Sequence, residues 1–316
     1  MLHIVVYHYV RDLPRTPFPR IKGMLLEDFR RQVVELRRQY EMATLESALD
    51  FLTGKYKPRA DLCLLTFDDG LKEHFTEVTP LLADHGIQGL FFLITSCLED
   101  HRVAPVHMNH FLMATLHFEE YRQAFLRRLK GSGREAASRR LDPAIVQRTY
   151  PLDTPAVAEF KYLFNFILDP TQRDQAVEEL FAKFVGGERP FARSLYLSWE
   201  EAIEMQNAGM VIGGHSHEHR PLATLGHEDL NRDLTTCRAL LAENLRPQPV
   251  WPFCYPYGKN DSFRDATIQK LQDVGFDCAF TTESDVNVPG MDLFRINRVD
   301  CNRAPLQQTA GAAYAR

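Results

Sequence analysis

The chain has 316 residues, of which 45% are hydrophobic and 25% charged, and its formal net charge is −5. That length suits one large α/β domain or two ordinary ones, and its 21 Phe and 11 Tyr supply a packed core. The acidic balance gives no reason to expect nucleic acid as a partner, because neutralising phosphates requires a basic surface.

Nothing in the sequence predicts a membrane span or a disulfide framework. No apolar run approaches the roughly 20 residues that a spanning helix requires. The first residues, Met1 to His8, lack a basic leader and have the pattern of a strand, so we expect a cytoplasmic protein. The six cysteines include no CxxC pair, and we interpret them as free thiols rather than as a zinc site. The oligomeric state is left open.

Strands alternate with helices over the first third of the chain. We expect strands at 2–7, 62–67 and 89–94, because these runs are apolar and of strand length. Between the first two strands, a helical stripe with spacings of four and three is followed by a short helix that Thr44 caps. After the second strand, another helical stripe ends at Gly86. This alternation predicts parallel strands joined by right-handed crossovers.

Helical signals replace the alternation from residue 97 to residue 193. One helical stripe starts at Phe111 and is expected to end near Gly131. Another starts at Thr154, with Pro155 as its first helical residue, and is expected to stop at Pro170. We interpret 97–193 as a helical insertion within a single domain that spans residues 1–316.

The alternation then resumes and completes the predicted fold. Ser198 and Glu201 form a capping box for a helix that ends at Gly209. Strands are expected at 210–213, 250–254, 278–281 and 294–299, with helices at 228–245 and 265–274. About seven strand–helix units favour a barrel over an open sheet.

Two adjacent carboxylates, Asp68 and Asp69, follow the strand at 62–67 and precede Gly70. Parallel α/β folds place reactive groups at this point, the C-terminal end of a strand. Because neighbouring side chains diverge, one acid can bind a metal while the other acts on a water. The alternative is structural, since Asp before Gly is common as a helix cap or turn residue.

The second motif contains His215 and His219 and also follows a strand. A spacing of four lets two imidazoles face one ion when the segment forms a helical turn. A carboxylate from another strand end, Asp69 or Asp68, would complete a site of two histidines and one acid with open positions for water. Chance pairs are common among 12 histidines, so the combination of the two motifs is the stronger signal.

A third segment, Pro252 to Gly258, again follows a strand. Its prolines and glycine fix a stiff loop, and a backbone N–H there is able to stabilise an oxyanion. The alternative is an ordinary aromatic turn in the core.

In this order, the T-F-D-D-G, H-S-x-x-H and Y-P-Y-G segments resemble the polysaccharide deacetylase superfamily, carbohydrate esterase family four, over roughly residues 1–96 and 194–300. The resemblance implies a distorted (β/α)7 barrel and metal-dependent hydrolysis of an N-acetyl group on an amino sugar. Carried over residue by residue, it makes Asp69, His215 and His219 the metal ligands and Asp68 the general base.

The resemblance also implies supporting roles. Ser216 would steady the histidine loop by a hydrogen bond, and the Tyr257 N–H would help to hold the oxyanion. We expect Tyr255 and Pro256 of the same loop to contact substrate. His107 reaches the sugar if the inserted helices fold over the mouth of the barrel.

The third motif of the family usually opens with an arginine that orients the base, and this sequence has Cys254 there. Arg295 or Arg298 is expected to supply the missing guanidinium, with Arg295 as the catalytic candidate. The alternative is a surface or interface arginine.

The family's late histidine, the general acid, is also missing, since no His follows His227. The circularly permuted poly-N-acetylglucosamine deacetylase branch carries this histidine at the end of its first strand, and His8 matches that position. We therefore expect His8 to protonate the leaving amine.

Together these residues predict a carbohydrate deacetylase with one divalent metal ion. Two imidazoles and a carboxylate suit zinc, and cobalt, nickel or iron would be accepted by the same ligands. The expected substrate is an N-acetylated sugar in a nucleotide-, lipid- or oligosaccharide-linked precursor of a surface glycan. Two alternatives stay open: hydrolysis of another C–N bond, as in a ureide or cyclic amide, and a non-catalytic carbohydrate-binding relic of the fold.

Overall fold

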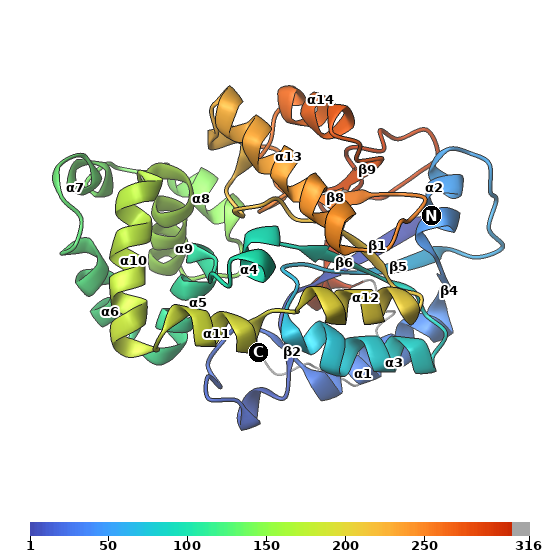
Figure 1. The fold of residues 1–316 in the computed structure, drawn as a ribbon, viewed down its shortest axis with the longest axis horizontal. Helices are drawn as coiled ribbons and strands as arrows, with labels where there is room; N and C mark the ends of the chain where they lie inside the picture. Colours follow the sequence, from blue (N-terminus) through green and yellow to red (C-terminus); the bar gives the residue numbers. More distant parts are fainter. Residues whose placement is uncertain (305–316) are drawn as a thin grey trace.

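A parallel sheet forms the centre of the computed structural model, which describes residues 1–304 (Figure 1). The strands follow the order β10-β1-β5-β6-β7-β8-β9, and β4 pairs with β5. Their bounds are β1 Leu2–Tyr7, β4 Glu41–Met42, β5 Leu62–Phe67, β6 Gly89–Leu93, β7 Val211–Gly214, β8 Pro252–Cys254, β9 Cys278–Phe280 and β10 Val299–Asp300. Two further strands, β2 Val10–Arg11 and β3 Met24–Leu25, pair separately.

Helices cover the outside of the sheet, as the alternating pattern predicted (Figure 1). Thr44 and Ser47 form a capping box on the second helix, and Ser198 and Glu201 form the expected one on α12. The bounds are α1 Leu26–Gln39, α2 Leu45–Leu52, α3 Thr79–Asp84, α12 Trp199–Asn207, α13 His227–Asn244 and α14 Asp265–Asp273.

The last segment of the sheet closes it into the expected distorted barrel. Ile296 accepts a hydrogen bond from Thr281 N–H at 2.7 Å and donates to Ala279 at 3.0 Å, which joins the segment to β9. A few residues later, Val299 pairs with Val5 of β1. The regular strand expected at 294–299 is only Val299–Asp300, yet the segment bridges β9 and β1.

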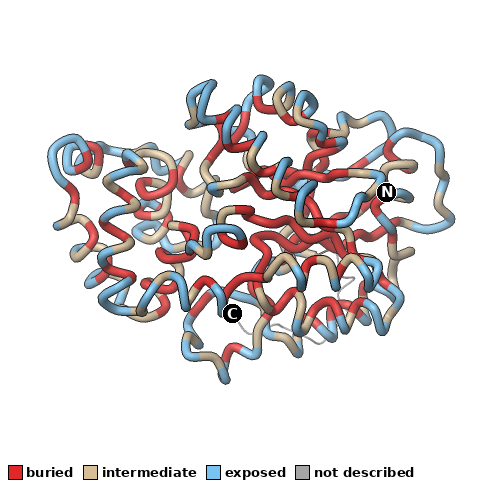
Figure 2. The backbone as a smooth tube through the Cα atoms, in the orientation of Figure 1, coloured by how far each residue is buried: buried red, intermediate tan, exposed pale blue. Residues whose placement is uncertain are grey.

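Alternate residues of the strands enter two separate cores. Leu62 and Leu64 belong to a cluster formed by residues of six barrel strands and of α2, so they face the barrel interior. Cys63, Leu65 and Phe67 belong to the larger cluster that includes the surrounding helices. The strands are buried on both faces, whereas the helices bury one side only (Figure 2). This alternation decides which residues point into the barrel mouth.

Eight helices between β6 and β7 form a lobe on one side of the barrel, facing the C-terminal ends of the strands (Figure 1). The buried apolar residues of the lobe and of the barrel's helical layer form one continuous cluster. The lobe helices are α4 Thr95–Glu99, α5 Pro105–Thr115, α6 Phe118–Leu126, α7 Gly131–Ala137, α8 Pro143–Thr149, α9 Pro155–Tyr162, α10 Pro170–Phe184 and α11 Glu188–Leu195.

The helical run that begins at Pro155 continues through a π-helical turn, Leu163–Ile167, and ends before Pro170 as expected. Pro170 itself begins α10, because proline suits the first helical position and Asp169 caps the helix by accepting from Gln172 N–H at 3.1 Å. Two other boundaries inside the lobe differ from the sequence prediction. Gly131 begins α7. The stripe from Phe111 is divided between α5 and α6, since Leu116 adopts an extended conformation.

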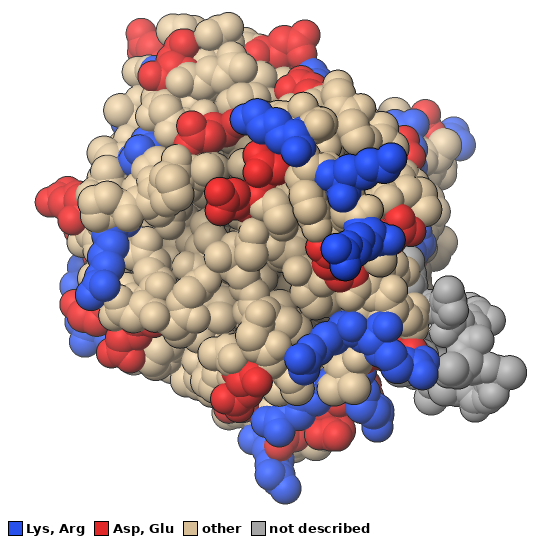
Figure 3. All heavy atoms as spheres, turned by 90° about the vertical axis from the view of Figure 1, so that its right-hand side faces the viewer, with Lys and Arg blue, Asp and Glu red and all other residues tan. Residues whose placement is uncertain are grey.

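Acidic and basic side chains are interspersed on the face drawn in Figure 3. Among residues 1–304, no helix combines the length and apolar character needed to cross a membrane.

A buried ion pair fastens the closing segment to the barrel. Arg298 is 1% exposed and donates to both oxygens of Asp68, at 2.8 and 2.7 Å. Its remaining donors reach Thr281 O, Thr66 Oγ1 and Cys254 Sγ. Burial alone would raise the pKa of Asp68, but the Arg298 guanidinium lowers that pKa to about 2.

The structure corrects the choice between the two candidate arginines. Arg295 pairs with Asp265 at 2.6 Å and is partly exposed, so its guanidinium lies away from Asp68. Residues 296 and 298 face the barrel interior, whereas 295 faces outward, and Arg298 therefore takes the position expected for Arg295.

We predict that Arg298→Met lowers the free energy of unfolding by about 3–5 kcal/mol, because it leaves the Asp68 carboxylate buried without its partner. The matched variant Arg295→Met removes a partly exposed pair and should cost less than about 1 kcal/mol. Urea unfolding of both variants measures the difference. Equal losses would contradict the structural importance of the Arg298–Asp68 pair.

The same pair predicts a pH dependence of stability. The folded-state pKa of Asp68, about 2, lies below its ordinary value of 3.8, so the pair's contribution is present above about pH 4 and lost as the pH falls towards 2. This linkage amounts to about 2 kcal/mol. The stability gap between wild type and Arg298→Met should therefore narrow between pH 5 and pH 2.5 in urea titrations. A gap that stays constant would contradict the assignment.

Candidate metal centre and active site

Inward-facing positions from different strands meet at the C-terminal mouth of the barrel. β1 and β5 pair in register, with Tyr7 opposite Phe67, so His8 and Asp68 are neighbours just beyond the strand ends. Asp68 N–H donates to Tyr7 O at 2.9 Å. His215 follows β7 in the same way, and its N–H donates to Leu93 O at 2.8 Å. Strand register thus brings motifs from distant parts of the sequence together.

Close packing between β7 and β8 depends on a glycine. A Cβ on Gly213 would lie 2.4 Å from Pro252 O and 2.8 Å from the Phe92 ring. Any larger residue would force the two strands apart and so displace His215, which directly follows β7, and Cys254, which ends β8. The glycine pair that precedes the histidines therefore has a packing role.

In a regular strand Asp69 would point away from the barrel interior, because its neighbour Asp68 points inward. An unusual backbone conformation directs the Asp69 side chain to the mouth instead. Its φ is 82°, in the left-handed region, and Gly70 follows with φ 64°. Asp69 Oδ1 lies 3.5 Å from both His215 Nε2 and His219 Nε2. This oxygen is buried and has no hydrogen-bond partner among the described residues.

The two histidines present ring nitrogens to the same point. His215 Nδ1 donates to Cys254 O at 2.8 Å, which leaves the Nε2 lone pair free to bind an ion. His219 Nε2 lies 3.2 Å from His215 Nε2. Burial lowers the pKa of His215, and it lowers that of His219 further, so both rings are neutral as metal ligands require.

These three atoms fit a divalent metal. Bonds of about 2.0–2.1 Å in a tetrahedral zinc site separate ligand atoms by about 3.3–3.4 Å, close to the separations of 3.2–3.5 Å found here. A metal would also satisfy the orphaned Asp69 Oδ1. The combination of Asp68, His215 and Cys254 is equally compact, but the Arg298 guanidinium already contacts Asp68 and Cys254 Sγ, and a fixed cation opposes a second one.

The histidine loop is fixed by hydrogen bonds to its backbone. Ser216 Oγ accepts from His219 N–H at 2.9 Å, the supporting bond that the resemblance implied. Asp233 of α13 is buried and accepts from His217 N–H at 3.0 Å and Glu218 N–H at 2.9 Å. The Asp233 contact could not be predicted from the sequence, because that acid is one of several along α13.

His8 lies at the open side of the mouth. Its Nε2 is 3.8 Å from Asp68 Oδ2, and its side chain is 46% exposed. The carbonyl of His8 accepts from His74 Nε2 at 2.9 Å, and His74 is fully buried. His8 therefore has a fixed backbone and a side chain that can meet a ligand, while His74 is structural.

The third motif divides into a buried part and a part at the site. Tyr255 is fully buried, its ring stacks on Phe263, and its hydroxyl donates to Phe294 O at 2.9 Å. Pro256 is buried as well. The expectation that these two side chains contact substrate conflicts with this burial: they support the loop from the core side.

Tyr257 is the residue of this loop that borders the metal centre. Its ring centroid lies 5.2 Å from that of His219, and its hydroxyl donates to Asn165 Oδ1 of the lobe at 3.1 Å. Its φ is 65°, in the left-handed region. Its backbone N–H makes no hydrogen bond to any residue of the described range. The N–H is available to an oxyanion.

His107 occupies a different place from the one expected. It lies in the first turn of α5, is 1% exposed, and contacts Asp69 Oδ2 through Nε2 at 3.1 Å. Its Nδ1 is 2.6 Å from the Tyr196 hydroxyl. Both ring nitrogens are engaged inside the protein, so His107 contacts the candidate metal ligand Asp69 instead of facing a sugar.

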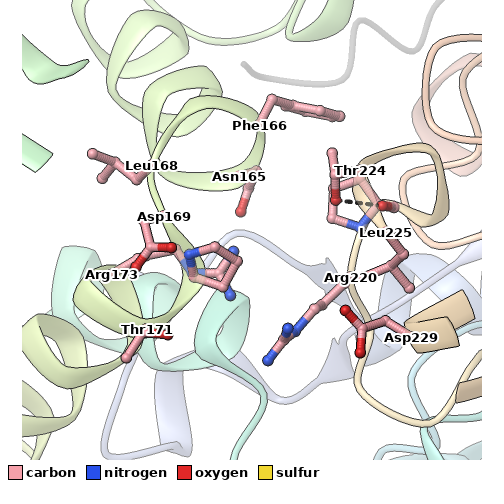
Figure 4. A pocket seen from close by; sticks show the side chains of 12 residues that line it. Asn165, Phe166, Leu168, Asp169, Thr171, Arg173, Arg220, Thr224, Leu225 and Asp229 are labelled. Carbon is pink, nitrogen blue, oxygen red and sulfur yellow. Dashed lines mark hydrogen bonds between the residues drawn. The ribbon is translucent and has the colours of Figure 1, made fainter. Parts of the chain in front are cut away.

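A cavity of about 300 Å³ lies beside the histidine loop, between the lobe and the barrel (Figure 4). Asn165 and Asp169 line it on the lobe side, and Arg220 and Asp229 line it on the other. Arg220 pairs with Glu218, and Arg173 at the cavity wall pairs with Asp174, so the charges are balanced locally. None of the residues that meet at the metal centre lines this cavity.

Comparisons with known proteins agree with this geometry. The family model described as polysaccharide deacetylase matches residues 55–141 and 167–279, which together exceed half of the chain. His8 and Arg298, which both approach Asp68, lie outside the matched residues. The chain has no match among curated protein sequences.

Several solved structures share the fold over most of their length. IcaB from Ammonifex degensii is 21% identical with a TM-score of 0.56, covering 94% of this chain and 90% of that one. The deacetylase PplD from Streptococcus pyogenes, solved with acetate, is 14% identical with a TM-score of 0.58, covering 95% and 91%. The BpsB deacetylase domain from Bordetella bronchiseptica is 18% identical with a TM-score of 0.53, covering 95% of both chains. The fold, the intact motifs and the family match together show that this chain belongs to the polysaccharide deacetylase family, a family of carbohydrate deacetylases that act on carbon–nitrogen bonds.

Proposed function

We propose that this protein is a metal-dependent de-N-acetylase that releases acetate from an N-acetylated amino sugar. The observation that carries the proposal is the convergence of Asp69 Oδ1, His215 Nε2 and His219 Nε2 within 3.2–3.5 Å of one another. Asp68 and His8 lie beside that set, as a base and an acid for amide hydrolysis would.

Asp69, His215 and His219 would hold the metal, and zinc is the ion that suits them best. When bound, such an ion polarises the acetamide carbonyl and lowers the pKa of water. The remaining steps belong to residues of the chain itself.

Asp68 would act as the general base. Its carboxylate is ionised, and Arg298 orients it by donating one hydrogen bond to each oxygen. Each carboxylate oxygen keeps a second lone pair, with which Asp68 would accept a proton from water. The Tyr257 N–H would donate to the oxyanion as the carbonyl carbon becomes tetrahedral. His8 would donate a proton to the departing amine, which is otherwise a poor leaving group.

We further propose that the substrate is a short, carrier-linked acetamido sugar instead of a long polymer. The lobe approaches the mouth at two points, His107 on Asp69 and Asn165 on Tyr257, and so narrows the mouth on that side. A cytoplasmic precursor linked to a nucleotide or a lipid would meet this constraint.

Acetate release tests the reaction. Wild type should release acetate from one class within a panel of nucleotide-linked, lipid-linked, polymeric and free N-acetylated sugars, and Asp68→Asn should lose at least 100-fold of that rate while its metal content stays the same. The matched variant Asp265→Asn changes an exposed acid and should keep full activity.

Two results would revise the proposal. Activity on long polymers alone would overturn the assignment of a short precursor. Bound metal without acetate from any sugar would direct the search to ureides and cyclic amides.

A second prediction concerns His8. His8→Gln should lower kcat by a factor of about 10²–10⁴ with unchanged metal content, because it removes the proton donor for the amine. His3→Gln, at the other end of β1, is the matched control and should leave kcat unchanged. If a substrate with an activated leaving group is affected as strongly as an acetamide, His8 is not the general acid.

A further inference from the structure

His107 of the inserted lobe contacts the carboxylate that the proposed function assigns to the metal. Its Nε2 lies 3.1 Å from Asp69 Oδ2, and both side chains are almost fully buried. We propose that His107, held by Tyr196, is a positioning residue that orients Asp69 for metal binding and so makes the lobe part of the metal centre. This inference rests on the proposed function.

The hydrogen bonds fix the role of each nitrogen of His107. A carboxylate oxygen only accepts, so His107 Nε2 must carry the proton that it shares with Asp69. His107 Nδ1 lies 2.6 Å from the Tyr196 hydroxyl. The oxygen of that hydroxyl accepts a hydrogen bond from Ala104 N–H at 3.1 Å. The ring is thus held at both nitrogens and cannot rotate away from Asp69.

This contact leaves the two oxygens of Asp69 unequal. Oδ2 is engaged by His107, whereas Oδ1 faces His215 and His219 and has no partner among the described residues. We therefore expect Asp69 to bind the metal through Oδ1 alone. A hydrogen bond to the second oxygen of a ligating carboxylate fixes the orientation of that ligand, and removing such a bond typically weakens metal binding 10–100-fold.

Both ends of the lobe hold the turn that carries Asp69. Where the chain enters the lobe, Ala104 and His107 contact Tyr196. Where the chain leaves it, Tyr196 forms a bridge with Leu71, and Leu197 N–H donates to Gly70 O at 2.9 Å. The lobe therefore contacts the left-handed Asp69–Gly70 turn at two places: the side chain of Asp69 and the backbone carbonyl of Gly70.

The test is the affinity for Zn²⁺, measured by competition with a chromophoric chelator. His107→Phe keeps the ring volume and removes the donor, and Tyr196→Phe removes only the hydroxyl. Each should weaken Zn²⁺ binding about 10–100-fold. The double variant should be scarcely weaker than His107→Phe, because the two residues act through one chain of hydrogen bonds.

The matched control is His110→Phe, which changes a histidine of the same helix whose Nδ1 lies 3.5 Å from the Tyr9 hydroxyl. Its Zn²⁺ affinity should stay within threefold of wild type. Thermal unfolding of each metal-free variant establishes that it is folded, and Tyr196→Phe decides the matter if His107→Phe is not.

The outcomes separate the two proposals. If wild type binds one Zn²⁺ and releases acetate while folded His107→Phe and Tyr196→Phe bind Zn²⁺ as tightly, the positioning role is overturned and the proposed function stands. If wild type binds no Zn²⁺, both the proposed function and this inference fall.

Discussion

The strict alternation of side chains along the barrel strands determines which groups at the strand ends face the mouth of the barrel. Residues 62 and 64 face the barrel interior, so 66 and 68 do so as well, and Thr66 and Asp68 both contact Arg298. β1 is in register with β5, which sets His8 opposite Asp68. A shift of one residue in either strand would turn Asp68 or His8 out of the mouth. The closing segment obeys the same rule, because Ile296 and Arg298 point inward and Arg295 does not.

The mouth is built from strained backbone that the rest of the fold stabilises. Asp69, Ser216, His219 and Tyr257 all have positive φ values, between 54° and 82°. Each such conformation costs about 1–3 kcal/mol for a residue other than glycine. Hydrogen bonds from the surrounding elements offset this cost: Asp233 holds the histidine loop, and Thr282 donates to Tyr257 O at 2.9 Å. Strain at all three motifs is what a preorganised site requires.

The sequence sufficed for the elements and for the groups carried by local motifs. Apolar runs of strand length predicted β1, β5 and β6 to within a residue, and the Ser198–Glu201 capping box predicted α12 to within two residues. The candidate ligand set Asp69, His215 and His219 follows from strand ends, which are local features, combined with the family pattern.

The contacts that depend on tertiary register could not be read in the same way. Arg298, and not Arg295, reaches Asp68 because of the inward alternation of a segment that forms only a two-residue strand, Val299–Asp300. His107 and Tyr196 are 89 residues apart, and only the folded lobe brings them to Asp69. For Tyr255 the sequence prediction failed in another way: its motif lies at the site, but its side chain is buried in the core.

The central claim is that Asp69, His215 and His219 hold a divalent metal beside Asp68. Diffraction from zinc-loaded crystals at the zinc absorption edge tests it most directly. The account predicts one anomalous peak bonded to Asp69 Oδ1, His215 Nε2 and His219 Nε2, with Asp68 still paired to Arg298. A peak bonded to Asp68 and Cys254 Sγ, or no ordered zinc at the barrel mouth, would contradict it.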